Sequence, residues 1–379
     1  MIYFDNSAST IFKPREVVCA VANALRYISA NPGRSGHAAA MRGAALVSSA
    51  RRKCAEFFGL NGDDGVIFTD NCTGALNLAI LGTARRGHIV TTALEHNSVL
   101  RPLYALKSRG EVSFTVVNPC DTGAVTAGAI ERAIRPDTYL VVVNHVSNVT
   151  GAIAPVTEIG RVCRRRNVLF LTDGAQSGGY VDVDMDEMNI DMLTIAPHKG
   201  LHAPQGVGVL LVGNRAKAVL HPVRYGGTGT SSDELSQPAD FPDGFETGTL
   251  PTPAIAGLCA AIGRCERDKR KDREIVNELS LRLRRGLKRI DGVEILSPEN
   301  ALSGITAFNT GDYDSGEVAD ILSSEYDICV RAGLHCAPLA HRYLGTLGRG
   351  AVRVSLGYDN TLREVDFFLR AVAEIAGKR

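Results

Sequence analysis

The chain has 379 residues, of which 45% are hydrophobic and 22% are charged, and its formal net charge is +1. This composition is typical of a globular protein, and the near-neutral charge argues against the broad positive surface of a dedicated nucleic-acid-binding or membrane-surface protein. No segment approaches the roughly 20 apolar residues of a transmembrane helix. We therefore expect no nucleic-acid partner and no membrane partner.

Nine cysteines are spread along the chain, and none of them forms a C-x-x-C pair. Their odd number and irregular spacing disfavour a disulfide framework or a structural zinc site, so we expect no bound metal. A free cysteine usually behaves as a small core hydrophobe, and free thiols are typical of a cytoplasmic protein. The first residues, Met1–Asp5, show no secretory signal, which agrees with that compartment.

Helical periodicity comes first along the chain, over Arg15–Ser29 and over the longer, Ala-rich Gly36–Phe58. Seven short apolar runs then read as strands: Val66–Thr69, His88–Thr92, Ser113–Val117, Tyr139–Asn144, Val168–Thr172, Met192–Ala196 and Val207–Val212. Helix-period stretches separate several of them, near residues 74–86, 97–109, 126–135 and 155–166. This alternation predicts an α/β fold whose mostly parallel, seven-stranded sheet has helices on both faces.

The pattern changes over residues 213–252, where Gly, Thr and Pro indicate loops. A long charged helix is predicted at about 254–290, and shorter strands and helices follow it. We therefore expect a large domain over residues 14–250. A smaller α+β domain should comprise residues 251–379, with residues 1–13 packed against it.

Two charged residues follow buried strands of the predicted sheet. Asp173 comes directly after Val168–Thr172, and Lys199 comes three residues after Met192–Ala196. The carboxyl ends of parallel strands meet at one edge of a sheet, where ligands bind in α/β folds. Pyridoxal phosphate (PLP) requires a lysine amine for its Schiff base and a carboxylate for its pyridinium nitrogen. The two residues therefore predict a PLP site.

Other polar residues follow neighbouring strands. Thr73 and Gly74 lie in a small-residue turn that leads into a helix, where exposed backbone N–H groups suit a phosphate. His96 could stack on the PLP ring and move protons, while Asn148 and Gln176 could donate to its phenolic oxygen. Each of these residue types also occurs in purely structural roles. The prediction of a PLP site therefore depends on their placement together at the ends of successive strands.

Cys336 lies in an unusual setting for a structural thiol. It follows His335 in a loop flanked by Gly and Pro, whereas a buried structural cysteine normally lies within an apolar periodic run. The nearby Arg331 would favour a thiolate, so we interpret Cys336 as a free nucleophile. Arg353, further along the chain, could clamp a substrate carboxylate through its planar guanidinium or form a structural salt bridge.

Together these residues resemble the class V, fold-type I PLP enzymes, and within them the cysteine desulfurases of the NifS/SufS type. The resemblance covers nearly the whole chain, and its last motif has the short spacer of the SufS-like branch. The matching segments are Tyr3–Thr10, Lys13–Pro14, Asn31–His37, Glu95–His96, Ser147–Asn148, Asp173–Gln176, His198–Lys199, Phe245–Thr249 and Arg331–Cys336.

The resemblance implies a role for each matching residue. Its catalytic residues are Lys199, Cys336 and His96. Its PLP-binding residues are Thr73, Gly74, His96, Asn148, Asp173, Gln176, His198, Lys199 and Thr249. Its substrate-binding residues are Arg353, Asn148, Arg34 and His37. Family members are homodimers in which a threonine of the neighbouring subunit completes the phosphate site, and Thr249 matches that position.

The implied activity is the conversion of L-cysteine to L-alanine with a persulfide left on Cys336. Its sulfur would pass to an acceptor protein, for example in iron–sulfur cluster assembly. A selenocysteine lyase shares the fold and the cofactor residues and stays an alternative. Other class V activities, such as aminotransferase or epimerase, fit less well because they do not need Cys336. A catalytically silent scaffold is disfavoured because Cys336 is present together with Lys199, Asp173 and His96.

Overall fold

The computed structural model describes the chain except residues 33–34, 232, 300 and 379. Its centre is a seven-stranded sheet with the strand order β2-β8-β7-β6-β5-β3-β4. The strands are β2 (Val66–Thr69), β3 (Gly87–Thr92), β4 (Val112–Val117), β5 (Thr138–Asn144), β6 (Leu169–Asp173), β7 (Met192–Ile195) and β8 (Gly208–Val212). Among the described strands of this sheet, only β8 pairs antiparallel with its neighbours. The predicted α/β fold with a mostly parallel sheet is confirmed.

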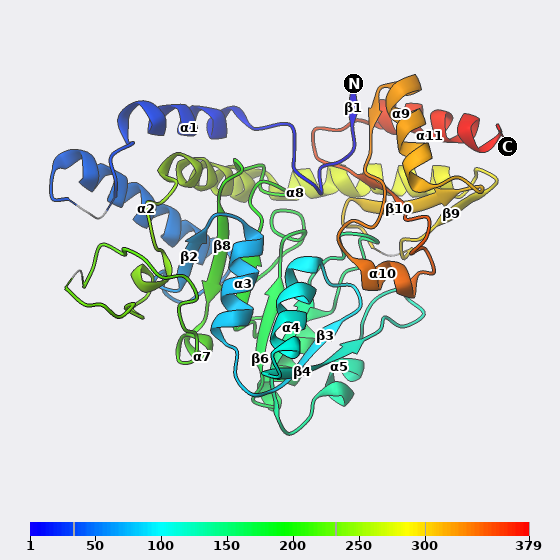
Figure 1. Cartoon of the computed structure of the whole chain (residues 1–379). Coiled ribbons are helices and arrows are strands. Elements are labelled where there is room, and N and C mark those ends of the chain that lie inside the picture. The colour runs from blue at the N-terminus through cyan, green and yellow to red at the C-terminus, as the bar shows by residue number, and fades with distance from the viewer. Residues whose placement is uncertain (33–34, 232, 300, 379) are drawn as a thin grey trace.

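Helices cover both faces of this sheet (Figure 1). The helices of the chain are α1 (Arg15–Tyr27), α2 (Ala38–Phe57), α3 (Cys72–Gly82), α4 (Asn97–Ser108), α5 (Ala127–Ala133), α6 (Val156–Arg165), α7 (Asn214–Lys217), α8 (Thr252–Leu287), α9 (Ser315–Tyr326), α10 (Pro338–Tyr343) and α11 (Leu362–Ala376). Helices α3 and α4 pack on one face of the sheet, and α2, α5, α6 and the first half of α8 pack on the other.

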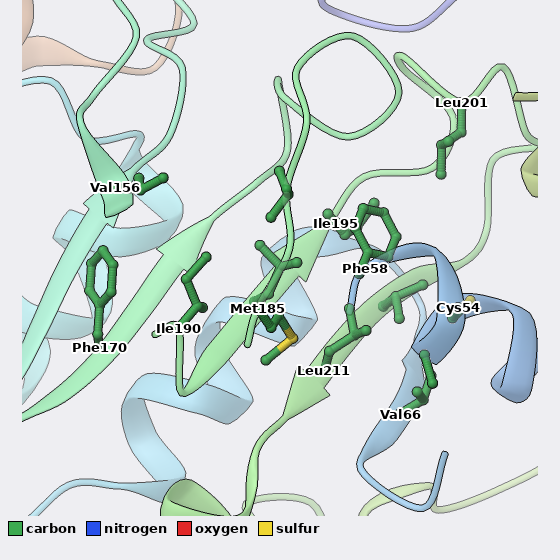
Figure 2. Packing of buried hydrophobic residues seen from close by; sticks show 14 of the residues in the cluster. Cys54, Phe58, Val66, Val156, Phe170, Met185, Ile190, Ile195, Leu201 and Leu211 are labelled. Carbon is green, nitrogen blue, oxygen red and sulfur yellow. The ribbon is translucent and has the colours of Figure 1, made fainter. Parts of the chain in front are cut away.

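The central strands read as continuous apolar runs because both of their faces are buried. Every residue of β5 is buried, and its neighbouring side chains point to opposite faces of the sheet. Val141 and Val143 belong to one hydrophobic cluster, while Leu140 and Val142 belong to the other. Figure 2 shows part of the first cluster, in which Phe170 of β6 is a member.

A second, smaller core lies in the C-terminal part of the chain. It contains an antiparallel sheet of β9 (Val293–Ile295), β10 (Ile305–Thr310) and β12 (Val352–Ser355), in the order β12-β10-β9. Helices α9, α11 and the second half of α8 pack around it. The N-terminal strand β1 (Ile2–Tyr3) pairs with β11 (Ile328–Cys329), so the first residues lie with this part of the molecule (Figure 1).

Helix α8 contributes to both cores. Its first half places Ile255 and Leu258 in the core on the sheet, and its second half places Leu279 and Leu283 in the smaller core. The division into residues 14–250 and residues 1–13 with 251–379 remains our proposal. Within the described residues, no helix is long and apolar enough to cross a membrane.

A substitution of Phe170 tests how far stability depends on the hydrophobic cluster to which this residue belongs. Its side chain is fully buried, and we expect Phe170→Ala to lower the free energy of unfolding by about 3–5 kcal/mol, because the change removes apolar contacts and leaves a cavity. Urea denaturation followed by circular dichroism measures this loss. Tyr225→Ala is the control, since Tyr225 is 80% exposed, and it should change stability by less than about 0.5 kcal/mol. Equal losses in the two variants would contradict the prediction.

Candidate active site

A cavity lies at the carboxyl ends of β5, β6 and β7, where ligands bind in α/β sheets. Its walls come from segments that are far apart in the sequence. Seven of the residues predicted for the site line it, namely Thr73, His96, Asn148, Asp173, Gln176, His198 and Lys199. The convergence of strand ends on one edge of the sheet therefore brings most of the predicted site together.

Asp173 and Lys199 both line this cavity, where they bring a carboxyl group and an amine. Asp173 is the last residue of β6, and its Oδ1 accepts the Ala175 N–H at 2.9 Å. Burial raises the pKa of Asp173, although this hydrogen bond and the Lys199 charge act in the opposite direction. Burial likewise lowers the pKa of Lys199, although the Asp173 carboxylate opposes that change. Burial therefore shifts both groups toward their neutral forms.

His96 caps the N-terminus of α4 and is fixed by its neighbours. Its Nδ1 accepts the Ser98 N–H at 3.1 Å and lies 2.9 Å from the Ser98 hydroxyl, which in turn lies 2.8 Å from the Thr73 hydroxyl. Because Nδ1 is an acceptor, the neutral ring carries its hydrogen on Nε2. Burial lowers the pKa of His96 to about 4, and the Lys199 charge acts in the same direction. The imidazole is therefore neutral at pH 7.

The start of α3 forms one wall of the cavity. The sequence predicts that this helix start binds phosphate. The helix begins at Cys72, two residues before the predicted start at residue 74, so Thr73 lies in its first turn. The Asn71 side chain caps the helix, and its Oδ1 accepts the Gly74 N–H at 2.9 Å. The backbone N–H groups at a helix start lack partners within the helix and favour anions.

Thr249 and Gly74 line a second cavity, which shares Thr73 with the first one. The loop that carries Thr249 is held by a buried ion pair between Arg51 and Glu246. Thr249 thus lies near the start of α3 of its own chain. Its predicted contact with the site of a neighbouring subunit stays a prediction.

Arg353 is 1% exposed, lies in β12 and does not line the cavity. Its Nη2 forms an ion pair with Asp5 at 2.8 Å, and its Nη1 donates to the Asn148 carbonyl at 2.9 Å. Its Nε, by contrast, has no hydrogen-bond partner among the described residues. The salt bridge that the sequence left open is therefore present, and the substrate-binding role stays a prediction.

Cys336 is exposed and lies in the loop before α10, outside the lining of the cavity. The preceding residue connects it to the site, because the Asn148 side-chain Nδ2 donates to the His335 carbonyl at 2.6 Å. His37 is also exposed; it caps α2 by accepting the Ala40 N–H at 3.2 Å. Arg34 lies outside the described residues, so its predicted role is not examined by the structure.

Glu95 lies beside the cavity, and the sequence pattern predicted no role for it. It is fully buried, and its Oε1 accepts the Thr92 hydroxyl at 2.6 Å and the Asn144 N–H at 3.0 Å. Asn144 itself lines the cavity, as do Cys72 and Ser98. Glu95 comes three residues after the end of β3, and Asp173 is the last residue of β6, so the same pattern of polar residues at strand ends could have identified Glu95. It ties the ends of β3 and β5 together beside His96.

Glu95 should make stability depend on pH. Burial raises its pKa from 4.5 to about 8, so the folded protein keeps a proton that the unfolded chain loses. The stability due to this group therefore falls as pH rises from about 4.5 to about 8. We expect the urea midpoint of Glu95→Gln to fall less over this range than that of the wild type. The exposed Glu266→Gln is the control, and a wild-type slope in Glu95→Gln would refute the prediction.

Comparisons with known proteins agree with this geometry. The family model named Aminotransferase class-V matches residues 2–368. A probable cysteine desulfurase of Methanothermobacter thermautotrophicus is 35% identical over 99% of this chain and 95% of its own length. The cysteine desulfurase IscS of Tolumonas auensis is 31% identical over 100% of this chain and 93% of its own.

Among solved structures, the apo cysteine desulfurase of Thermococcus onnurineus NA1 matches with a TM-score of 0.92 and 31% identity, over 100% of this chain and 95% of that one. These matches do not distinguish the SufS-like branch from others, so that assignment stays a prediction. The chain belongs to the class V aminotransferase family, within its cysteine desulfurases.

Proposed function

We propose that this protein is a PLP-dependent cysteine desulfurase, a sulfurtransferase that converts L-cysteine to L-alanine and keeps the sulfur as a persulfide on Cys336. The observation that carries the proposal is the hydrogen bond between the loop of an exposed cysteine and Asn148, which lines the cavity of Lys199 and Asp173. Family membership supports the same reaction, because relatives over the full length of the chain are named cysteine desulfurases.

The donor set of the cavity fits PLP. Asp173 offers a buried carboxylate for the pyridinium nitrogen, and Lys199 offers an amine for the aldehyde. Asn148 has a buried Oδ1 that lacks a partner among the described residues, and its Nδ2 keeps one free hydrogen for the phenolic oxygen, which Gln176 would also contact. The phosphate would lie at the start of α3. The residues proposed to bind it are Thr73, Gly74, His198 and, from a neighbouring subunit, Thr249.

Bound PLP would withdraw electrons from the substrate α-carbon and make its proton acidic. The Lys199 amine would accept that proton in its neutral form, which burial favours by lowering the pKa of the lysine. Asp173 would keep the proton on the ring nitrogen, and His96 would stack on the ring with its Nε2–H as a donor. Arg353, with Asn148, Arg34 and His37, would bind and orient the substrate.

Sulfur transfer would be performed by Cys336. Its thiolate attacks the substrate sulfur, so that a new S–S bond forms while the substrate Cβ–S bond breaks. Cβ keeps the bonding electrons and takes up a proton, which gives the methyl group of alanine. A further thiol, on an acceptor protein, would then take the sulfur from the persulfide.

The proposal also covers the cellular compartment and the oligomeric state of the protein. We place the enzyme in the cytoplasm as a homodimer, in which Thr249 reaches the neighbouring site. Four of its cysteines are buried, three are half-buried and two are exposed, and all nine are free thiols, which suits a reducing compartment.

The first test measures alanine and sulfide formed from L-cysteine with a reductant. We expect the rate of alanine formation by Cys336→Ser to be more than about 100-fold lower than that of the wild type, because the group that accepts the sulfur is removed. The variant should retain the absorbance of bound PLP. Cys19→Ser, which changes the other exposed thiol, should keep the wild-type rate. Sulfide release at the wild-type rate by Cys336→Ser would contradict the assignment of Cys336 as the nucleophile. A large preference of the wild type for L-selenocysteine would favour a selenocysteine lyase instead.

A second test distinguishes Lys199 from Lys13, which also lies beside the site. Lys13 donates to the His198 carbonyl at 3.3 Å, and burial lowers its pKa to about 8, so both amines are candidates for a Schiff base. After borohydride reduction, mass spectrometry should locate PLP on the Lys199 peptide of the wild type. Lys13→Ala should retain this label and Lys199→Ala should lose it. Label on the Lys13 peptide would show that the lysine is wrongly assigned.

A further inference from the structure

The backbone at Cys336 has an uncommon conformation. His335 and Cys336 both adopt left-handed torsions, with φ of 48° and 58°. Residues with a Cβ seldom adopt this conformation, because the Cβ crowds the following carbonyl oxygen. In the described part of the chain, the other non-glycine residues with positive φ occur singly. The turn of residues 335–336 must therefore be stabilised by contacts outside itself.

Both carbonyl groups of this turn accept hydrogen bonds, one from a residue that lines the cofactor cavity and one from a residue next to its lining. The Asn148 Nδ2 donates to the His335 carbonyl at 2.6 Å, and the Asn97 backbone N–H donates to the Cys336 carbonyl at 2.7 Å. Asn97 is the first residue of α4 and follows His96, which lines the cavity. Its N–H is one of the groups at a helix start that have no partner within the helix.

The side chain of His335 fixes the turn from the opposite side. The ring is 4% exposed, and its Nε2 lies 3.0 Å from the Ala351 carbonyl, to which it donates. It also packs beside the ring of His341, at 5.8 Å between centroids. The turn therefore lies between the C-terminal part of the chain, to which it belongs in sequence, and the sheet that carries the cavity.

We propose that the Asn97 N–H and the Asn148 side chain form a clamp that positions Cys336 relative to the cofactor cavity. The two accepting carbonyls belong to the peptide groups on either side of the Cys336 Cα. When both peptide groups are fixed, the nucleophile can move only by rotation of its side chain. Asn97 is thus a positioning residue that acts through its backbone. Its effect on catalysis rests on the proposed desulfurase function, but the clamp itself does not.

Proline at position 97 removes one bond of the clamp and leaves the helix intact. Asn97→Pro deletes the N–H, and proline is favoured at the first position of a helix. The preceding residue, His96, has φ of −71° and ψ of 155°, which is the conformation that a residue before proline prefers. The proline ring also stands against the Cys336 carbonyl, which adds to the effect. Asn97→Ala is the matched variant, because it removes the side chain and keeps the N–H.

Two readouts distinguish positioning from a general loss of structure. We expect amide hydrogen exchange over residues 333–337 to be at least about fivefold faster in Asn97→Pro, as one lost hydrogen bond predicts. With L-cysteine, kcat for alanine should fall by at least the same factor, while KM and the PLP absorbance stay as in the wild type. Asn97→Ala should match the wild type in both readouts. Ala127→Pro, at the first position of α5, controls for proline itself.

Each outcome decides one part of the proposal. Exchange over residues 333–337 that is equal in Asn97→Pro and Asn97→Ala would overturn the clamp, whether or not the protein uses L-cysteine. Faster exchange with an unchanged kcat would overturn the positioning role. Failure of the wild type to form alanine would refute the desulfurase function, and the exchange result would still test the clamp.

A second variant covers the case in which Asn97→Pro unfolds. Asn148→Asp removes the other donor and places a carboxylate against the His335 carbonyl. Measured on the PLP-free protein, exchange over residues 333–337 should again be at least about fivefold faster than in the wild type. Wild-type exchange in this variant would overturn the contribution of Asn148.

Discussion

Burial of two oppositely charged groups in one cavity is the constraint on which the site depends. Burial raises the pKa of Asp173 and lowers that of Lys199, so each group is driven toward its neutral form. For Lys199 this change favours the free amine that a Schiff base and a proton transfer both require. For Asp173 the same change creates a demand for a cation, which a pyridinium nitrogen would supply. The low dielectric of the cavity therefore selects the chemistry of both residues.

The sheet supplies that environment because its parallel strands end together. Asn144 and Asp173 are paired neighbours at the ends of β5 and β6, and both line the cavity. Glu95 connects the Asn144 backbone to the end of β3. Its carboxyl group contributes no charge to the proposed reaction. By fixing adjacent strand ends, Glu95 holds the side chains that we propose to react in fixed positions relative to one another.

The strands of the sheet could be predicted from the sequence, whereas several contacts of the site could not. The difference has a physical reason. Strands β5 and β6 are buried, mostly apolar runs that stop at polar residues, Asn144 and Asp173, so their bounds and final side chains can be read locally. Helix α3 begins two residues before its predicted start, because Cys72 and Thr73 suit a turn and a first helical turn alike. The partner of Arg353 is Asp5, 348 residues away, and no local pattern could reveal it. The hydrogen bond from the Asn97 backbone N–H could not be predicted either, because nearly every residue type has this group.

The placement of Cys336 meets two opposing requirements of the proposed reaction. A thiol that gives its sulfur to another molecule must be accessible, and the Cys336 side chain is exposed. A nucleophile that attacks a substrate at the cofactor must also be held in a defined position, because misplacement of the reacting atoms slows the reaction steeply. Fixing the backbone on both sides of a residue while leaving its side chain free satisfies both requirements. This also explains why two left-handed residues, costly in isolation, occur together at this point of the chain.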